Sequence, residues 1–408
     1  MNDENANCAH DGEEYAQLSL LQLPVEIFLH ICSFLDASTL VHRLSLVCKQ
    51  FYLILKDDAL LHMWKARINH IWPNATHTLL RPAKPDKLFW MSSCFAIEKQ
   101  IALWKQQDSM VKLRNRNINP NSIRSVLLMH DATACVGATG TTLFYWKLPT
   151  RERISYAIHI DFRYIGQICE LTAIDNTIYS CDFGHSVKSW MLTGTDLVHL
   201  RTYDIKMRNC QTCVSSCPER ALFAIGSEYG IYVFDSRSSN KPINQYRPHN
   251  TTMTALAMNT EYILSASWDG TVSVWDQRAG RIMKSITIPG RYTVPTCMSM
   301  RRDNWVCVGD TKAKLHMLDP KNDFELVKSY STEHTDEITG VRLMRGCLIT
   351  SSIDGTVRMS SLTDPPRPIA TLRSKFEDIL SMDYMNDTLA VSSLGIEIWR
   401  PKLTRSFR

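Results

Sequence analysis

The segment LSASWDGTVSVWDQR, residues 264–278, has the pattern of two short strands joined by a tight turn. Asp269-Gly270 suits the turn, because glycine accepts the positive φ that tight hairpin turns require. The residues after it, TVSVW, are mostly β-branched or aromatic, and such residues favour a strand. The segment therefore predicts a β-hairpin.

This hairpin pattern recurs in weaker copies from about residue 120 to the end of the chain. The copies are VGATGTTLFYWKL, YSCDFGHSVKSWML, AIGSEYGIYVFDSR, VGDTKAKLHMLDP, TSSIDGTVRMSSL and VSSLGIEIWRPK. Successive equivalents of Trp275 lie 39 to 44 residues apart. They are Trp146, Trp190, Phe234, Trp275, Leu318, Ser360 and Trp399. This period, with its Trp-Asp ending, resembles WD-repeat propellers, where each repeat forms one four-stranded blade. We therefore expect an all-β, seven-bladed propeller.

The last copy indicates how the ring closes. GIEIWRPK is followed only by LTRSFR, so the seventh blade lacks an outermost strand of its own. In propellers of this family an N-terminal segment often supplies that strand. We expect residues 108–118, DSMVKLRNRNI, to do so, which would also protect an exposed sheet edge.

The resemblance also implies a buried structural tetrad in the best-matching repeat. Its members would be His249, Ser267, Asp269 and Trp275. The sixth copy keeps the histidine, serine and aspartate but has Ser360 in place of the tryptophan. The other copies depend on spacing and strand pattern alone.

The N-terminal part of the chain has a helical period instead. In LPVEIFLHICSFLD, residues 23–36, Leu23, Ile27, Ile31 and Leu35 recur every four residues, which predicts one stripe of a helix. Pro24 suits the first helical turn. Asp36 or Ser38 could cap a second helix. The apolar residues of the second and third expected helices are Leu40, Leu44, Val47, Phe51, Leu60, Trp64 and Ile68.

Further apolar residues lie off these stripes and predict a second apolar face that needs a cover. Either the rest of the chain or another protein could supply that cover. The off-stripe residues are Phe28, Phe34, Leu46, Cys48 and Leu53.

Residue types as well as spacing in this region resemble the F-box. The matching features are the opening Leu-Pro with Glu-Ile, then SFLD, then VCKQF, and a closing Leu60 and Trp64. The F-box docks on the Skp adaptor of a cullin-RING ubiquitin ligase, and we expect its core to be separate from that of the propeller. The resemblance assigns adaptor binding to Leu23, Pro24, Ile27, Ile31, Leu35, Val47 and Cys48.

A helix is expected between the F-box and the propeller. In DKLFWMSSCFAIEKQIALWKQQD, residues Phe89, Ser93, Ile97, Ile101 and Trp104 share one helical face. Such a helix would act as a stiff spacer. The whole order resembles the F-box/WD-repeat family. We therefore divide the chain into a disordered acidic tail (1–17), an F-box (18–70), a helical linker (71–107) and the propeller (108–408).

Composition limits the classes of partner and compartment. The net charge of +5 on 408 residues is modest and scattered, which does not favour nucleic-acid binding. No apolar run reaches about 20 residues, so we expect no membrane span. Thirteen cysteines spread along the chain are typical of a reducing compartment, here the cytoplasm or nucleus. The cluster at Cys210, Cys213 and Cys217 lacks the fourth ligand that structural zinc requires, so strand cysteines are the better interpretation.

No sequence pattern here favours catalysis or a cofactor. A Ser267/His249/Asp269 hydrolase is one alternative, but no Gly-x-Ser-x-Gly elbow or phosphate-binding loop occurs. The family resemblance instead implies a non-catalytic receptor that brings a target to a ubiquitin-charged enzyme through cullin and RING proteins. A scaffold that binds the same adaptor without ubiquitylating a target is the other alternative.

Target binding in this family commonly uses the face that carries the turns just before the tetrad aspartate, and some relatives bind phosphopeptides there through arginines. The equivalent residues in this chain are Thr139, Phe183, Ser227, Trp268, Thr311, Ile353 and Ser392. None is basic. We expect Trp268, Phe183 and Ile353 to act as apolar anchors, with Arg124 as the nearest basic candidate. The alternative is that these are ordinary loop residues.

Overall fold

The computed structural model of the protein describes the N-terminal helices, the linker helix and all seven expected sheets. The described residues are 20–56, 61–72, 79–80, 89–105, 110–116, 122–140, 142–148, 157–161, 167–182, 186–193, 196–205, 213–228, 230–300 and 305–401. The expected tail, residues 1–17, lies outside them. Among the described helices, none combines the length and the apolar character that crossing a bilayer requires.

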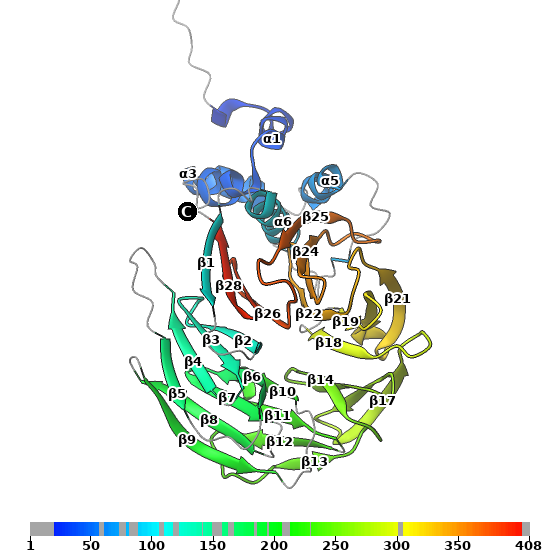
Figure 1. Cartoon of the computed structure of the whole chain (residues 1–408). Coiled ribbons are helices and arrows are strands. Elements are labelled where there is room, and N and C mark those ends of the chain that lie inside the picture. Colours follow the sequence, from blue (N-terminus) through cyan, green and yellow to red (C-terminus); the bar gives the residue numbers. More distant parts are fainter. Residues whose placement is uncertain are drawn as a thin grey trace, which may run out of the picture.

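Seven four-stranded antiparallel sheets form a closed ring (Figure 1). This confirms the seven-bladed propeller that the repeat period predicted. Blade 1 consists of β2 (Ile123–Met129), β3 (Ala134–Thr139), β4 (Thr142–Lys147) and β5 (Ala157–Asp161). Blade 2 consists of β6 (Ile168–Ile174), β7 (Thr177–Asp182), β8 (Ser186–Thr193) and β9 (Asp196–Asp204). Blade 3 consists of β10 (Cys213–Cys217), β11 (Leu222–Gly226), β12 (Ile231–Asp235) and β13 (Asn244–Tyr246).

The later blades repeat this arrangement with short turns. Blade 4 contains β14 (Met253–Met258), β15 (Tyr262–Ser267), β16 (Thr271–Asp276) and β17 (Arg281–Thr287). Blade 5 contains β18 (Pro295–Met300), β19 (Val306–Asp310), β20 (Lys314–Asp319) and β21 (Glu325–Ser331). Blade 6 contains β22 (Ile338–Leu343), β23 (Leu348–Ser352), β24 (Thr356–Ser360) and β25 (Pro368–Arg373). Two 3-10 turns, η5 (Pro218–Arg220) and η6 (Pro320–Asn322), join strands in blades 3 and 5.

Blade 7 joins the two ends of the propeller. It consists of β26 (Ser381–Met385), β27 (Thr388–Ser392), β28 (Gly395–Pro401) and β1 (Met110–Arg116), with β1 outermost. β1 and β28 pair in antiparallel register from Met110 with Pro401 to Arg116 with Gly395. The predicted strand donor therefore closes the ring, because its backbone groups satisfy the free edge of β28.

Short helices precede the propeller, and Figure 1 shows them beside blades 6 and 7. Asp36 caps α2 (Ala37–Thr39), since its Oδ1 accepts a hydrogen bond of 2.8 Å from Thr39 N. The helices are η1 (Leu20–Gln22), α1 (Val25–Ser33), α2 (Ala37–Thr39), the π-helical turn η2 (Leu40–Leu44), α3 (Ser45–Val47), α4 (Lys49–Lys56), α5 (Leu61–Ile71) and the linker helix α6 (Phe89–Lys105).

The expectation of separate cores is wrong. Buried helical residues such as Phe28, Trp64 and Ile68 belong to one continuous cluster with Trp305 and Leu348 of blades 5 and 6. Trp305 Nε1 also donates a 3.1 Å hydrogen bond to the carbonyl oxygen of Leu79. A helical unit of about fifty residues encloses only a marginal core by itself, so the propeller completes it.

The linker helix α6 is packed between the two parts and is not a free spacer. Its Trp104 is fully buried, and Gln100 donates 3.1 Å hydrogen bonds to Tyr384 Oη and Asp387 Oδ1 of blade 7. A side chain at Gly346 would overlap the Ala96 backbone, so only glycine permits this close approach. Of the predicted apolar face of α6, Trp104 packs with residues of blades 6 and 7, whereas Ile97 belongs to the cluster that the N-terminal helices share with blades 5 and 6.

Candidate functional site

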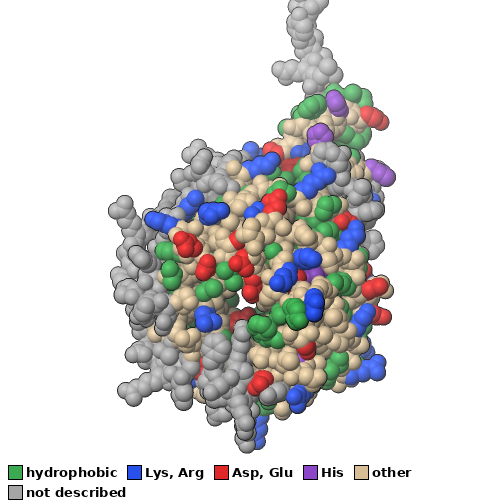
Figure 2. Space-filling view, turned by 45° about the vertical axis from the view of Figure 1, so that its right-hand side comes forward, with side chains coloured by type: hydrophobic (Ala, Val, Ile, Leu, Met, Phe, Trp, Pro, Cys, Tyr) green, Lys and Arg blue, Asp and Glu red, His purple; other side chains and the backbone are tan. Residues whose placement is uncertain are grey.

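The F-box helices expose many large apolar side chains. Phe34 is 77%, Leu46 is 75% and Val47 is 67% exposed. Figure 2 shows hydrophobic side chains at the surface of the upper end, where α1 lies in Figure 1. Concentrated exposure of this kind marks an interaction surface. We call it the F-box surface, formed by Leu20, Val25, Ile27, Ile31, Phe34, Leu46, Val47, Tyr52 and Leu53.

The residues predicted for adaptor binding lie partly on this surface. Ile27, Ile31 and Val47 belong to it, and Pro24 is exposed at the start of α1. Leu35 and Cys48 are half-buried against the core cluster, and Leu23 is also half-buried.

Phe28 corrects our assignment of the second apolar face. It is buried and stacks on Phe51 with ring centroids 4.6 Å apart, so it holds α1 to α4. The predicted adaptor set also omitted Phe34, Leu46 and Leu53, although their off-stripe positions had marked them as apolar residues without a cover.

The other candidate surface is the propeller end that carries the β15–β16 and β23–β24 turns, which we call the turn face. Trp268 is 58% exposed there, and Ile353 is half-buried. Arg124 is exposed on β2, and Phe183 lies outside the described residues. Helix α6 contacts the opposite end of the strands, where Arg345 Nη1 donates a 2.8 Å hydrogen bond to Ser92.

Several of the seven predicted turn positions are not at the surface. Thr139, Ser227 and Ser392 are buried, because they end or directly follow strands β3, β11 and β27. In blade 7 the exposed turn residue is Leu394, which is 53% exposed. The repeat alignment was therefore displaced at some blades, where the turn lies one or two residues later.

A second aromatic residue of the turn face was missed in the sequence. Tyr292 is 80% exposed and has a φ of 59°, which is uncommon for a bulky residue. The Arg291 guanidinium lies 5.2 Å from its ring centroid. The loop between β17 and β18 is held beside the Trp268 turn, since Ile288 N donates a 2.9 Å hydrogen bond to Gly270 O.

The predicted tetrad needs one correction, because its serine is Ser265. His249 Nε2 lies 2.8 Å from Ser265 Oγ, and His249 Nδ1 lies 3.4 Å from Asp269 Oδ2. Side chains two residues apart on a strand share one face, which made Ser265 and Ser267 equivalent by pattern. Burial lowers the pKa of His249, so the neutral ring is favoured.

The hydrolase alternative fails on geometry. Ser267 is fully buried, and its Oγ lies 2.7 Å from Thr251 Oγ1 and 3.0 Å from Thr252 O. A nucleophile needs a nearby base and access to substrate. The Ser267 hydroxyl has neither a base beside it nor access to a substrate. It ties the preceding loop to β15 instead.

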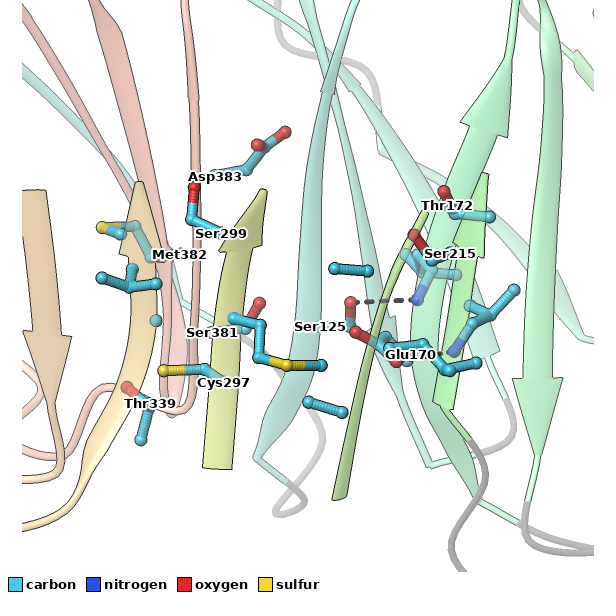
Figure 3. Close-up of a pocket in the computed structure, with 18 of the residues that line it drawn as sticks. Ser125, Glu170, Thr172, Ser215, Cys297, Ser299, Thr339, Ser381, Met382 and Asp383 are labelled. Carbon is cyan, nitrogen blue, oxygen red and sulfur yellow. Dashed lines mark hydrogen bonds between the residues drawn. The ribbon is translucent and has the colours of Figure 1, made fainter. Parts of the chain in front are cut away.

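The central channel of the ring is polar but has a structural role. Figure 3 shows Ser125 and Glu170 reaching across to the neighbouring strand, and Figure 2 shows acidic side chains beside the central hollow. Ser125 Oγ accepts 3.2 Å from Leu171 N, and Glu170 Oε2 accepts 2.8 Å from Val214 N. These bonds join blades 1 to 2 and 2 to 3, so the channel side chains hold the ring together.

The cysteines do not build a metal centre in the described part of the chain. Cys213 and Cys217 are buried thiols on β10, whereas Cys210 lies outside the described residues. No group of three His, Cys, Asp or Glu residues suited to a metal ion occurs among the described residues.

Comparison with known proteins agrees with this architecture. The F-box-like family model matches residues 20–64, and the model of the WD domain, G-beta repeat, matches residues 240–276. F-box/WD repeat-containing protein 9 of Bos taurus is 26% identical over 96% of this chain and 85% of its own length. The Homo sapiens protein of the same name is 26% identical over 93% of this chain and 82% of its own length.

A further relative has the same domain combination in its name. F-box/WD repeat-containing protein mec-15 of Caenorhabditis elegans is 21% identical over 76% of this chain and 77% of its own length. The chain thus combines an F-box with WD repeats, and these features support a role as a substrate adaptor.

Proposed function

We propose that this protein, which combines an F-box with a WD-repeat propeller, is the substrate-recognition subunit of a Skp-cullin-F-box ubiquitin ligase. The F-box surface would bind the Skp adaptor, and through it cullin and a RING protein. The turn face would bind the target protein. The chain itself would perform no chemistry.

The observation that carries this proposal is the two-sided F-box. One side, which includes Phe28 and Ile68, is buried in the core shared with the propeller. The other side exposes Phe34, Leu46 and Val47 to solvent. The described part of the chain therefore covers only one of the two apolar sides, and a protein partner would supply the missing cover.

The position of the two surfaces suits a receptor. Helix α6 lies against the strand ends opposite the turn face. Its Ser92 accepts a hydrogen bond from Arg345, which lies in the β22–β23 turn at that opposite end. A packed helix keeps the adaptor and the target at a fixed separation. Catalysis would come from proximity, because the complex raises the effective concentration of a target lysine near the ubiquitin-charged enzyme.

The compartment is also part of the proposal. The eleven cysteines in the described part of the chain are free thiols, which is the state expected in the cytoplasm or nucleus.

The test changes one exposed residue of the F-box surface. Ile27→Asp places a charge on α1 at a residue that is 48% exposed, so folding should be preserved while adaptor binding falls at least tenfold. Val327→Asp on β21 is the matched control, because this valine is 43% exposed on the propeller. The measurements are affinity for purified Skp adaptor and co-purification of cullin from cells.

Two outcomes would contradict the proposal. Undiminished adaptor binding by soluble Ile27→Asp protein would remove the docking assignment. Capture of the adaptor without cullin, under conditions where another F-box protein captures both, would favour the scaffold alternative.

A further inference from the structure

Blade 6 lacks the large side chain that the other blades have at one repeat position. Trp275 in blade 4 and Trp399 in blade 7 fill it with an indole, and Phe234 in blade 3 fills it with a phenyl ring. Ser360 stands there in blade 6, at the end of β24. The small side chain of Ser360 leaves space between blades 5 and 6.

In blades 3 and 4 this side chain packs on a tyrosine of the preceding blade. Trp275 stacks on Tyr246 with centroids 3.7 Å apart and planes inclined by 11°. Phe234 meets Tyr203 edge to face at 5.3 Å. Both tyrosines lie on the outermost strand of the preceding blade, so the aromatic pair fills the gap between blades.

Tyr330 occupies the same position in blade 5, where its Oη donates a 2.9 Å hydrogen bond to Asp364 Oδ1, but no aromatic ring of the described residues packs on it in this way. It pairs with Leu315 on β20, as Tyr246 pairs with Ile231 on β12, and both paired residues lie three residues before the repeat position. Beside Tyr330 is a cavity of about 250 Å³, lined also by Ser360. It lies where blade 4 holds the Trp275 indole.

The size of the cavity suits one side chain. Pockets for drug-sized molecules measure about 300–1,000 Å³, and this one is smaller. It opens between β21 and β24, where Ser331, Glu333 and Pro368 are exposed.

Polar groups in the lining match those that receive an indole elsewhere in the ring. In blade 2, Trp190 Nε1 donates a 2.9 Å hydrogen bond to Ser180 Oγ. Thr350 is the blade 6 equivalent of Ser180, and its Oγ1 lies 2.8 Å from His334 Nε2. A hydroxyl that donates to histidine can still accept from a ligand N–H.

Arg358 adds a donor that lacks an acceptor. Its Nη1 donates a 2.5 Å hydrogen bond to Glu333 Oε2. Its buried Nε has no hydrogen-bond partner among the residues that the structure describes. Buried donors are normally satisfied, so a ligand carbonyl beside the aromatic group would complete this site.

We propose that the cavity between blades 5 and 6 is a second peptide-binding site, which takes a tryptophan side chain of a partner protein. The indole stacks on Tyr330, its N–H donates to Thr350 Oγ1, and the adjoining backbone carbonyl accepts from Arg358 Nε. This site is separate from the turn face and does not depend on the ligase assignment.

The test uses the full chain and N-acetyl-tryptophanamide, an indole with neighbouring carbonyl groups. We expect saturable binding, measured by ligand-observed NMR and by a rise in Tm. Ser360→Trp fills the cavity from within and should weaken binding at least tenfold while raising the Tm of the free protein. Ser360→Leu, which imitates Leu318 of blade 5, serves if the tryptophan variant fails to fold.

Two further variants separate this site from non-specific binding. Trp275→Ser opens the matching space beside Tyr246 and should create an additional indole site. Arg358→Met should weaken N-acetyl-tryptophanamide while leaving free indole unaffected.

The proposal is overturned by three results. One is the absence of saturable binding at millimolar probe. Another is equal affinity in wild type and in a folded Ser360 variant. A third is that indole binds as tightly as N-acetyl-tryptophanamide, which would show a site for free small aromatics and not for a peptide.

Discussion

Arg67 Nε donates a hydrogen bond of 2.5 Å to Glu98 Oε1, which joins α5 of the F-box to the linker helix α6. The other oxygen of Glu98 accepts 2.7 Å from Ala37 N at the start of α2. One carboxylate therefore holds two F-box elements against the helix that is packed on the propeller. Both side chains are less than one-fifth exposed.

Glu98→Ala should loosen the F-box from the propeller. The change leaves the Arg67 guanidinium and the Ala37 N–H without their acceptor, at a cost of roughly 1–3 kcal/mol. Limited proteolysis should cut the F-box region faster, and chemical unfolding should lose cooperativity. Glu98→Gln is the control, because it keeps an oxygen acceptor for Ala37 N. Identical proteolysis of Glu98→Ala and wild type would refute the role of this residue.

Separate alanine substitutions of Ser265 and Ser267 test the corrected tetrad. Ser265→Ala removes the hydroxyl beside His249 Nε2 and should lower stability by about 1–3 kcal/mol. Ser267→Ala should also destabilise, through lost bonds to Thr251 and Thr252. Double-mutant cycles with His249→Ala distinguish them, since only Ser265 should couple to the histidine. Coupling to Ser267 alone would restore the tetrad that the sequence suggested.

The repeat period predicted the blade count because each repeat of about 40 residues forms one four-stranded blade. The strand donor was also predictable, since a ring with one missing strand needs a donor at its other end. The serine of the tetrad was not. Ser265 and Ser267 point to the same side of β15, and only the packing of His249 decides between them.

Tertiary packing also decided which F-box residues are covered. Phe28 and Ile27 are neighbours on α1, and the sequence could not show that Phe28 would stack on Phe51 while Ile27 stays 48% exposed. Tyr292 was missed because its exposure depends on a loop conformation with positive φ, which no periodic pattern announces.

Glu170 should make stability depend on pH. Burial, the largest cause, raises its pKa to about 7, against the opposing effect of the hydrogen bond from Val214 N. An unfolded glutamate has a pKa near 4.3. Because the folded pKa is the higher one, the contribution of Glu170 is present below about pH 4.3 and is lost as pH rises through 7.

The measurement is urea unfolding of wild type and Glu170→Gln at pH 5 and pH 8. Between pH 5 and pH 8 the free energy of unfolding of the wild type should fall relative to that of the variant. The fall should be about 1.4 kcal/mol for each unit by which the folded pKa of Glu170 exceeds the unfolded pKa within this pH interval. The contributions of other titrating groups to the pH dependence cancel, because wild type and variant share those groups. A difference in the unfolding free energy that does not change with pH would show that Glu170 titrates normally.

The turn face should recognise an apolar target motif, independently of phosphate. Trp268 and Tyr292 are more than half exposed on adjoining loops, and Ile353 adds a half-buried apolar side chain. A phosphate-binding face needs several converging cations, since a doubly charged group must be desolvated. The exposed cations Arg124 of β2, Arg291 of the β17–β18 loop and Lys312 of the β19–β20 turn come from three different elements, and we expect them not to converge on one phosphate.

Trp268→Ala and Tyr292→Ala should each reduce target capture at least tenfold while leaving adaptor binding intact, because truncated aromatic anchors typically cost about 2 kcal/mol or more. Val198→Ala on β9, which removes another exposed apolar side chain, is the control. Capture should persist after phosphatase treatment of the lysate and should depend weakly on salt, since apolar contacts are not screened by ions. Release of the target by phosphatase would instead assign a phosphopeptide site to this face.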